Sequence, residues 1–264
     1  MKIRIYAPYS FQGIGSKDKQ EDTLYPLMGE ASSLNRVFMV CDGMGGHEKG
    51  EVASYCVAST IGKYVEDSNS LTLNHMHLAL NQGLEKAYDE LDRLDADNTS
   101  VLKMGTTLTF MGICDDGVLL GHIGDSRIYQ LRPQKGIIFQ TRDHSLMNQL
   151  IDSGSITPEE ALTHPQRHVI TRAILPHEEY HFSVSCKMNY DVQAGDIFLL
   201  CSDGVLEQVT NEELERILLS DASLHDRMNL LEHTCEERNT FDNFSAYLIQ
   251  IAESNIIHEP TPQI

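Results

Sequence analysis

The chain has 264 residues, of which 41% are hydrophobic and 22% charged, a balance typical of a globular protein with a sizeable core. Its 39 acidic residues outnumber its 20 basic ones, and the formal net charge of −19 argues against nucleic acid or an anionic membrane as a partner. The six cysteines form no CxxC pair, so we expect reduced thiols in a cytoplasmic protein rather than disulfides or a zinc site. We expect neither a signal peptide nor a membrane span, because no apolar stretch is long enough.

The N-terminal segment predicts two short strands around a polar loop. The alternation of Lys2–Tyr6 is typical of an opening strand, and residues 13–19 form a Gly-punctuated loop. Glu21 and Asp22 then precede the short run Thr23–Met28. Two adjacent acids at such a place are, taken alone, the solvated residues of a turn.

The next segment places a carboxylate at the end of a buried strand. Val37–Cys41 is a continuous apolar run, which predicts a strand buried on both faces. Asp42 and the Gly-rich turn at 43–46 follow it, and from Glu51 onward apolar residues recur at helical spacing. Glycine lets the backbone turn so that the Gly43 carbonyl can face the same point as the carboxylate. Such oxygens suit hard divalent cations; the alternative for this motif alone is an Asx-type turn.

The middle of the chain predicts a long helix and then a hairpin. Leu71–Leu94 keeps an apolar stripe at helical spacing. Thr106–Ile113 and Val118–Ile123 are strands joined by a tight turn. The second strand runs into Gly124-Asp125-Ser126 and resumes as Ile128–Leu131, which predicts a bulge where backbone or ligand approaches closely.

Residues 143–175 break this regular alternation. A short helix at Ser145–Ser153 is followed by the capping box Thr157-Pro158-Glu159-Glu160, which gives its acids a structural role. Short helices and loops between strands predict a mobile surface insert here.

The remainder of the chain returns to strands and helices within one domain. The predicted elements are strands at His181–Met188, Ile197–Cys201 and Phe244–Ile251, and helices at Thr210–Glu213 onward and Leu224–Cys235. Two further acidic motifs lie at strand ends, Ser202-Asp203-Gly204 and Asp242-Asn243. We predict a single domain over residues 1–252 and a loose tail over 253–264, where two prolines discourage regular structure.

Six carboxylates thus lie at strand ends or Gly-rich breaks: Glu21, Asp22, Asp42, Asp125, Asp203 and Asp242. Carboxylates that converge at one end of a sheet repel and desolvate each other, so such a cluster needs cations. Two divalent ions about 4 Å apart can bridge a water molecule, lower its pKa and clamp a phosphoryl group. The spacing makes a site for two metal ions a hypothesis.

Taken in order, these motifs resemble metal-dependent serine/threonine protein phosphatases of the 2C type, in their bacterial form. The sequence DGMGGHEKGEVAS at Asp42–Ser54 resembles the family signature most closely. The other matching elements are Glu21-Asp22, Gly105-Thr106-Thr107, Gly124-Asp125-Ser126-Arg127, Ser202-Asp203-Gly204 and Asp242-Asn243. His164-Pro165 to Thr171-Arg172-Ala173 resembles the family's flap region, which falls in the insert at about 143–175. The resemblance spans Gly15 to about Ile251.

The resemblance implies an α+β fold, a four-layer α-β-β-α sandwich with two central antiparallel sheets flanked by helices. It implies metal-dependent hydrolysis of phosphoserine and phosphothreonine in proteins, by direct attack of a metal-bridging water without a phosphoenzyme. The implied partners are phosphorylated proteins and a cognate serine/threonine kinase system. We expect a monomer.

The resemblance also implies two Mn²⁺ or Mg²⁺ ions, with Asp42, Asp203 and Asp242 as the catalytic ligands. Asp42 would bridge the two ions, the Gly43 carbonyl would bind one of them, and Asp203 and Asp242 would complete the other. Asp125, together with Asp203, would hold a third, weaker ion.

The remaining implied residues act less directly. Glu21 and Asp22 would bind metal largely through coordinated water. Lys17 stands where the family usually has an arginine that meets the substrate phosphate, and a point charge positions phosphate less firmly than a planar fork. Gln20 replaces a usual asparagine. Met44 replaces the proposed general-acid histidine of eukaryotic relatives, and the nearby His47 is equally well a structural residue.

Two alternatives to an active protein phosphatase remain open. The first is a catalytically weak relative that binds phosphoproteins, and the second is a phosphatase for small phosphoesters. Every implied metal ligand is present in the chain, which favours activity.

Overall fold

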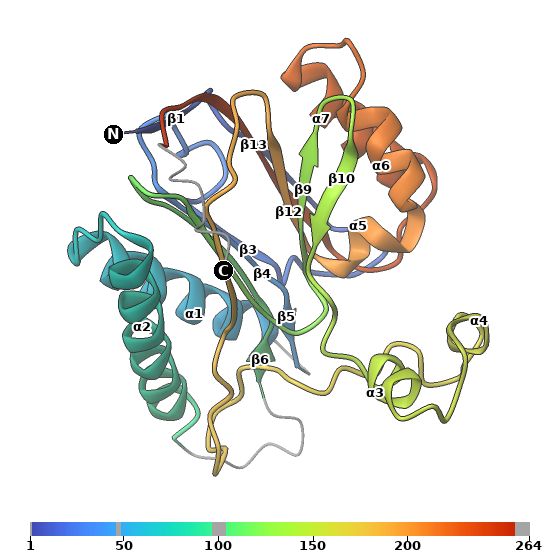
Figure 1. Cartoon of the computed structure of the whole chain (residues 1–264). Coiled ribbons are helices and arrows are strands. Elements are labelled where there is room, and N and C mark those ends of the chain that lie inside the picture. The colour runs from blue at the N-terminus through green and yellow to red at the C-terminus, as the bar shows by residue number, and fades with distance from the viewer. Residues whose placement is uncertain (1, 46–48, 97–103, 257–264) are drawn as a thin grey trace.

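The computed structural model describes residues 2–45, 49–96 and 104–256, and it confirms the predicted sandwich. Figure 1 shows two sheets packed face to face, with α1 and α2 covering one outer side and α5, α6 and α7 the other. The helices α3 and α4 stand apart from both helical layers. The four layers therefore follow the order helix, sheet, sheet, helix.

The larger sheet is antiparallel throughout, and β13 lies inside it. Its described strands run in the order β1 (Ile3–Ile5), β13 (Phe244–Ser254), β12 (Ile197–Cys201), β9 (Arg127–Arg132) and β10 (Gly136–Gln140), with β2 (Tyr9–Gly13) also pairing with β13. The long β13 therefore pairs with β1 and β2 along one edge and with β12 along the other.

The remaining strands of the described segments form a smaller sheet and a short two-stranded ribbon. The order in the smaller sheet is β11 (Ser185–Asn189), β8 (Val118–Ile123), β7 (Leu108–Ile113), β4 (Val37–Cys41) and β3 (Thr23–Tyr25). The ribbon pairs β5 (Gly43–Met44) with β6 (Gly105–Thr106) just beyond the end of β4.

The helices of the described segments are α1 (Lys49–Asp67), α2 (Leu73–Leu94), α3 (Leu146–Asp152), α4 (Pro158–Ala161), α5 (Asp203–Gln208), α6 (Asn211–Leu218) and α7 (Leu224–Glu237).

Strand alternation explains how each sheet buries both faces. In β4, Phe38 and Val40 pack into the core between the sheets, whereas Met39 packs under α1 and α2. In β12, Phe198 enters the same central core, and Leu199 packs under α5–α7. Each continuous apolar run therefore serves two cores.

The helix-start signals in the sequence are confirmed. Thr157 and Thr210 each close a capping box with the glutamate three residues later. Ser145 caps α3, and Gly154, with φ of +70°, follows that helix.

Several predicted boundaries are wrong, and four elements were missed. The strand expected at His181–Met188 begins only at Ser185, where pairing with β8 starts. The strand β13 continues to Ser254, because its last residues pair with β1, where Arg4 lies opposite Glu253. The first residues of the expected tail therefore belong to this strand. The missed elements are β2, β10, the six-residue helix α5 and the two-residue strand β5, which falls in the predicted Gly-rich turn.

The break at Gly124–Ser126 is not a bulge within one strand. The strand β8 belongs to the smaller sheet and β9 to the larger one, so the chain crosses between the sheets here. We call residues Gly124–Arg127 the crossover. Gly124 has a φ of +103°, and a Cβ atom there would lie 2.6 Å from the Thr107 side chain, so glycine is required.

The cysteines have free thiols as expected, five of them buried. Within the described residues, no helix is both long and apolar enough to span a membrane.

Candidate functional site

The expected acidic residues converge where strands of both sheets end. Asp42 follows β4, Asp203 opens α5 directly after β12, and Asp242 precedes β13. Asp125 lies in the crossover, and Asp22 precedes β3. The structure brings these five aspartates so close together that the charges of the other four act on Asp42.

Hydroxyl groups fix the backbone that carries Asp42. The Thr107 hydroxyl accepts a hydrogen bond from the Asp42 N–H at 3.0 Å, and the Thr106 hydroxyl donates to the Asp42 carbonyl at 2.8 Å. The Thr107 hydroxyl also lies 2.7 Å from that of Ser126 in the crossover. A break between β6 and β7 at Thr107, inside the predicted strand Thr106–Ile113, makes these contacts possible.

Gly43 lies where three backbone segments meet. A Cβ atom at this position would lie 2.3 Å from the carbonyl oxygens of both Glu21 and Gly50. The Gly-rich turn is therefore needed for close approach, as the sequence suggested.

The two N-terminal acids are held by different partners. The Asp22 side chain is buried and accepts a hydrogen bond at 2.8 Å from the Ser202 hydroxyl through Oδ2, while its Oδ1 is buried without a partner. Glu21 accepts a hydrogen bond from the backbone N–H of Gly50, in the first turn of α1. A carboxylate at a helix N-terminus is favourably placed.

Lys17 lies in the cluster, but its ammonium group already has a partner. Its Nζ is 2.8 Å from Asp242 Oδ1, and both side chains are one-third exposed. Lys17 also faces the charges of Glu21 and Asp42 and lies 5.6 Å from the Phe241 ring centroid. The predicted phosphate-binding residue is thus placed among the acids, bound to one of them.

Burial and mutual repulsion raise the pKa of the clustered carboxyls. Burial raises the pKa of Asp42 well above its usual range, and the surrounding carboxylates raise it further. Burial also raises the pKa of Asp125 to about 7 and that of Asp203 to about 6, with the charge of a neighbouring aspartate adding to each.

This arrangement fits a divalent cation. Two buried oxygens, Asp22 Oδ1 and Asp203 Oδ1, have no hydrogen-bond partner, although buried polar atoms are normally paired. The donors are hard carboxylate oxygens, the class that Mg²⁺ and Mn²⁺ prefer. In the described part of the chain, no three such side chains are already grouped around one point, so binding requires the carboxylates to close in.

The insert and α5 enclose a cleft of about 1200 Å³ that contains two of these carboxylates. Asp125 and Asp203 line it, together with Phe241 and with residues of the insert such as Met147 and Leu162. The cleft thus joins the acidic cluster to a partly apolar surface.

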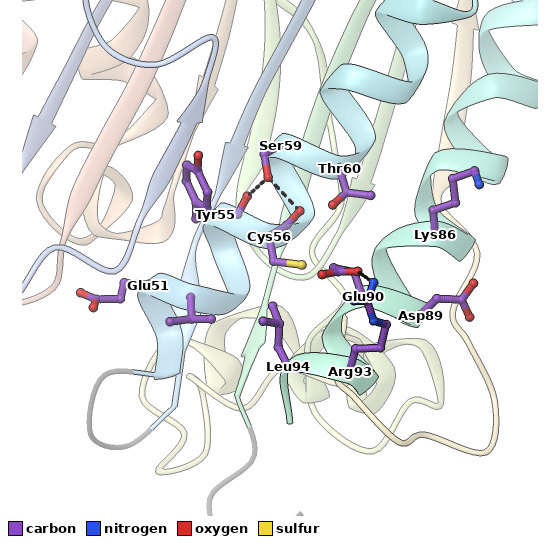
Figure 2. Close-up of a pocket in the computed structure, with 11 residues that line it drawn as sticks. Glu51, Tyr55, Cys56, Ser59, Thr60, Lys86, Asp89, Glu90, Arg93 and Leu94 are labelled. Atoms are coloured by element: carbon purple, nitrogen blue, oxygen red, sulfur yellow. Dashed lines mark hydrogen bonds and ion pairs between the residues drawn. The ribbon is translucent and has the colours of Figure 1, made fainter. Parts of the chain in front are cut away.

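A second hollow, of about 920 Å³, lies between α1 and α2 and is shown in Figure 2. Its residues include Tyr55, Lys86 and Arg93, and the last forms an ion pair with Glu90 at 2.6 Å. None of the expected ligands lines it. The cleft beside the carboxylates is therefore the better candidate for substrate binding.

Sequence reasoning missed three residues at the site. Buried Asn243 accepts a hydrogen bond from the Glu21 N–H at 2.7 Å and donates to the carbonyls of Ile14 and Lys19, so it orders the loop that carries Lys17. Thr107 holds Asp42, as described above.

The third residue, His168, lines the cleft together with Asp203. Asn243 and Thr107 stand in two of the motifs noted in the sequence, Asp242-Asn243 and Gly105-Thr106-Thr107, whereas nothing in the pattern distinguished His168. His47 lies outside the described residues.

Comparison with known proteins gives one consistent result. The family model described as "Protein phosphatase 2C" matches residues 16–242. The chain is 32% identical over 219 residues to the protein phosphatase PhpP of Streptococcus pneumoniae, covering 83% of this chain and 87% of PhpP.

Solved structures agree with this result. The serine/threonine phosphatase Stp1 from Staphylococcus aureus superposes with a TM-score of 0.81 at 29% identity, covering 95% of this chain and 97% of that one. The catalytic domain of the serine/threonine protein phosphatase PstP, in complex with two manganese ions, gives a TM-score of 0.74 at 28% identity, covering 95% of this chain and 100% of that one.

Proposed function

Because this chain belongs to the protein phosphatase 2C family and is a protein serine/threonine phosphatase, we propose that it hydrolyses phosphoserine and phosphothreonine in proteins with the help of divalent metal ions. The observation that carries the proposal is the cluster of largely buried, mutually repelling carboxylates, two of which, Asp125 and Asp203, line the cleft. Such a cluster destabilises the fold unless cations neutralise it.

The ligands proposed for two ions are Asp42, the Gly43 carbonyl, Asp203 and Asp242, with Glu21 and Asp22 acting through water and Asp125 serving a third, weaker ion. When bound, Mn²⁺ or Mg²⁺ lowers the pKa of water and neutralises charge on a transferring phosphoryl group. The binding of two manganese ions by PstP supports this choice of metal and number.

The chain's own residues hold and orient the reacting groups. Thr106 and Thr107 fix the main chain at Asp42, and Ser202 orients the Asp22 carboxylate. Lys17 would turn from Asp242 to the phosphate once cations neutralise that aspartate. Met44 has no proton to donate, so the departing serine or threonine oxygen takes its proton from another group.

The cleft suggests why the substrate is a protein. If the phosphoryl group of a substrate binds near Asp125 and Asp203, the polypeptide that carries it lies in the cleft, against residues of the insert and Phe241. We propose that the insert acts as the flap of this domain. The proposed partners are phosphorylated proteins and the kinase that modifies them.

The direct test is hydrolysis of a phosphothreonine peptide with Mn²⁺, and again after addition of excess EDTA. We expect turnover with Mn²⁺, loss of turnover with EDTA, and recovery when metal is restored. Undiminished hydrolysis in EDTA would contradict the metal mechanism.

The two alternatives give different outcomes. Much higher kcat/KM on p-nitrophenyl phosphate than on the peptide would identify a phosphatase for small phosphoesters. Tight peptide binding by calorimetry without turnover would identify a phosphoprotein-binding relative.

A further inference from the structure

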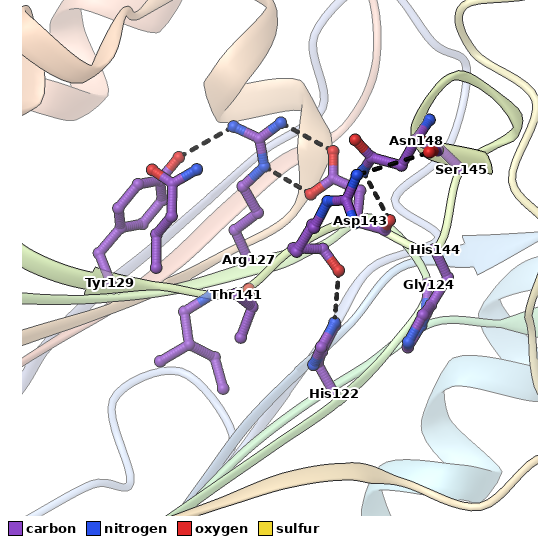
Figure 3. A network of polar contacts seen from close by, with 12 residues as sticks. His122, Gly124, Arg127, Tyr129, Thr141, Asp143, His144, Ser145 and Asn148 are labelled. Carbon is purple, nitrogen blue, oxygen red and sulfur yellow. Dashed lines mark hydrogen bonds and ion pairs between the residues drawn. The ribbon is translucent and has the colours of Figure 1, made fainter. Parts of the chain in front are cut away.

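Both main-chain polar groups of Gly124 are held by a single residue, His144. The His144 N–H donates to the Gly124 carbonyl at 2.9 Å, and the Gly124 N–H donates to Nδ1 of the His144 imidazole at 3.1 Å. Figure 3 shows the ring beside the crossover. Because Gly124 adopts a left-handed φ of +103°, these two bonds hold a conformation that few residues adopt.

The tautomer of His144 follows from its partners. Nδ1 accepts from Gly124, so in the neutral ring the proton lies on Nε2, which is 3.0 Å from the Ser185 hydroxyl. The ring also stacks on His122, with a centroid distance of 4.5 Å and an interplanar angle of 2°. The imidazole is thus fixed in plane and in rotation.

The same residue joins both ends of the insert to the crossover. The Thr171 N–H donates to the His144 carbonyl at 2.7 Å, and Ser145 forms a β-bridge with Ile170. The chain therefore enters and leaves the insert beside His144. A displacement at this point would move the insert relative to the crossover.

The other end of the crossover is held by the preceding residue. Arg127 donates from Nε and Nη2 to the two carboxylate oxygens of Asp143, at 2.6 and 2.7 Å, as Figure 3 shows. Such a two-pronged ion pair fixes orientation as well as distance. Asp143 and His144 thus hold the two ends of the crossover between them.

Asp125 lies between these two attachments. Asp125 is bonded directly to Gly124 and lies two residues before Arg127, within the crossover. The direction of the carboxylate therefore follows the backbone of the crossover. A rotation at Gly124 would turn Asp125 away from Asp203, whose charge acts on it and which lines the same cleft.

We propose that His144 is a positioning residue, which holds the Gly124 backbone through Nδ1 and thereby aims the Asp125 carboxylate at its cation while tying it to the insert. The proposal rests on the proposed function, because Asp125 matters only if it binds a cation beside the substrate. The insert that receives the polypeptide and the carboxylate nearest to it then move as one unit.

The test compares three substitutions that separate the two ring nitrogens. In His144→Asn the side-chain amide oxygen can replace Nδ1 as the acceptor for the Gly124 N–H. In His144→Gln the longer side chain can replace only Nε2, which faces Ser185. In His144→Phe the stacked ring remains, but both nitrogens are lost. His181→Gln, at an exposed position outside the network, is the matched control. Thermal unfolding of every variant verifies that it is folded.

The first readout needs no catalysis. We expect the Gly124 amide to exchange with solvent about tenfold faster in His144→Gln and His144→Phe, as for loss of one hydrogen bond, and within about threefold of wild type in His144→Asn. The weakest Mn²⁺ site in a calorimetric titration should lose affinity in the same two variants. Should one of them not fold, the Asn and Gln variants, which are closest in chemistry, still give the comparison.

The second readout is kinetic. On a phosphothreonine peptide, kcat should fall about tenfold in His144→Gln and His144→Phe with little change in KM, and His144→Asn should retain most of it. Equal damage in His144→Asn and His144→Gln, or unchanged Gly124 exchange and Mn²⁺ affinity in His144→Phe, would overturn the proposal. If wild-type protein hydrolyses no phosphopeptide, the proposed function fails, while amide exchange and the Mn²⁺ titration still decide the role of His144.

Discussion

At the scale of single residues, Asp42 faces the negative charges of four other aspartates, Asp22, Asp125, Asp203 and Asp242. We expect Asp42→Asn to lower kcat by at least about 100-fold, because it removes a charge needed to hold metal. In EDTA, however, the same substitution should raise the melting temperature, because a neutral amide relieves repulsion in the cluster. Kinetics and calorimetry check both effects.

The exposed acid Asp221 provides the control. Asp221→Asn should change neither quantity. A lower melting temperature for Asp42→Asn in EDTA would show that the carboxylate has a favourable structural role instead.

Substitution of Lys17 tests whether its ammonium group, which pairs with Asp242, also binds the substrate phosphate. Lys17→Ala should raise KM for a phosphopeptide about tenfold, the effect of losing one charged hydrogen bond, with little change in kcat. Lys17→Arg should preserve or lower KM, since the guanidinium adds a second prong. Initial-rate kinetics decide this, with the exposed Lys63→Ala as control; an unchanged KM in Lys17→Ala would limit Lys17 to its contact with Asp242.

His144 also makes the free energy of unfolding depend on pH. Burial, His122 and Arg172 lower its pKa from 6.5 to about 4 in the folded protein. Between these values the unfolded chain binds a proton that the folded chain does not, so the free energy of unfolding falls as the pH falls from 6.5 to about 4.

Denaturant unfolding of wild type and His144→Asn at pH 7 and pH 5 measures this contribution. The difference between the two proteins isolates His144, because they share all other titrating groups. We expect wild type to lose more stability than His144→Asn on acidification, and an equal loss would contradict the prediction.

The positions of Asp42 and Asp203 were predictable because each follows a run whose structure the sequence determines. Asp42 and Asp203 follow continuous apolar runs, which became β4 and β12 buried on both faces. Sequence periodicity cannot show which sheet a strand joins, so the role of Gly124 in crossing between sheets was unpredictable. The contacts of Asn243 and His168 depend on chain segments far away in sequence, and no local pattern reports them.

At the scale of secondary-structure elements, helices were predicted better than short strands. Helix α6 was predicted from its capping box, whose bonds are local. Strands β2 and β10 were missed because each has five residues, only one of them fully buried in β2 and none in β10. Their pairing with distant strands, rather than their own apolar pattern, makes them strands.

The pairing of β9 with β12 contains an ion pair whose strength is testable. Arg132 Nε lies 2.7 Å from Asp196 Oδ1, with only 8% and 0% of the two side chains exposed. Asp196→Ala should cost about 3–5 kcal/mol of unfolding free energy, because it leaves a buried arginine without this partner. Denaturant unfolding measures the loss.

An exposed ion pair in the same sheet is the matched comparison. Arg4 and Glu253 lie 3.2 Å apart, with 64% and 50% of their side chains exposed. Glu253→Ala should change the unfolding free energy by less than about 1 kcal/mol. Equal losses in the two variants would show that burial does not set the strength of the Arg132–Asp196 pair.

At the scale of the whole molecule, metal binding should raise stability, because the carboxylates come from segments that meet only in the folded chain. At a Mn²⁺ concentration 100 times the dissociation constant, the stabilisation should be about 2.7 kcal/mol per site. Scanning calorimetry with and without Mn²⁺ measures the rise in melting temperature, and EDTA should reverse it. Asp203→Asn should show a smaller rise, and an identical rise would place the binding elsewhere.

The position of β13 has a consequence for biosynthesis. β1 and β2 are made first, yet their partner in the larger sheet is β13, which begins at Phe244. A nascent chain that has not reached this strand keeps the edges of β2 and β12 unpaired, and such edges invite association with other chains. Asp242 lies two residues before the start of the same strand, so the acidic cluster is complete only shortly before β13 is made. During translation, therefore, an exposed and aggregation-prone half-sheet comes before any metal-loaded, active enzyme.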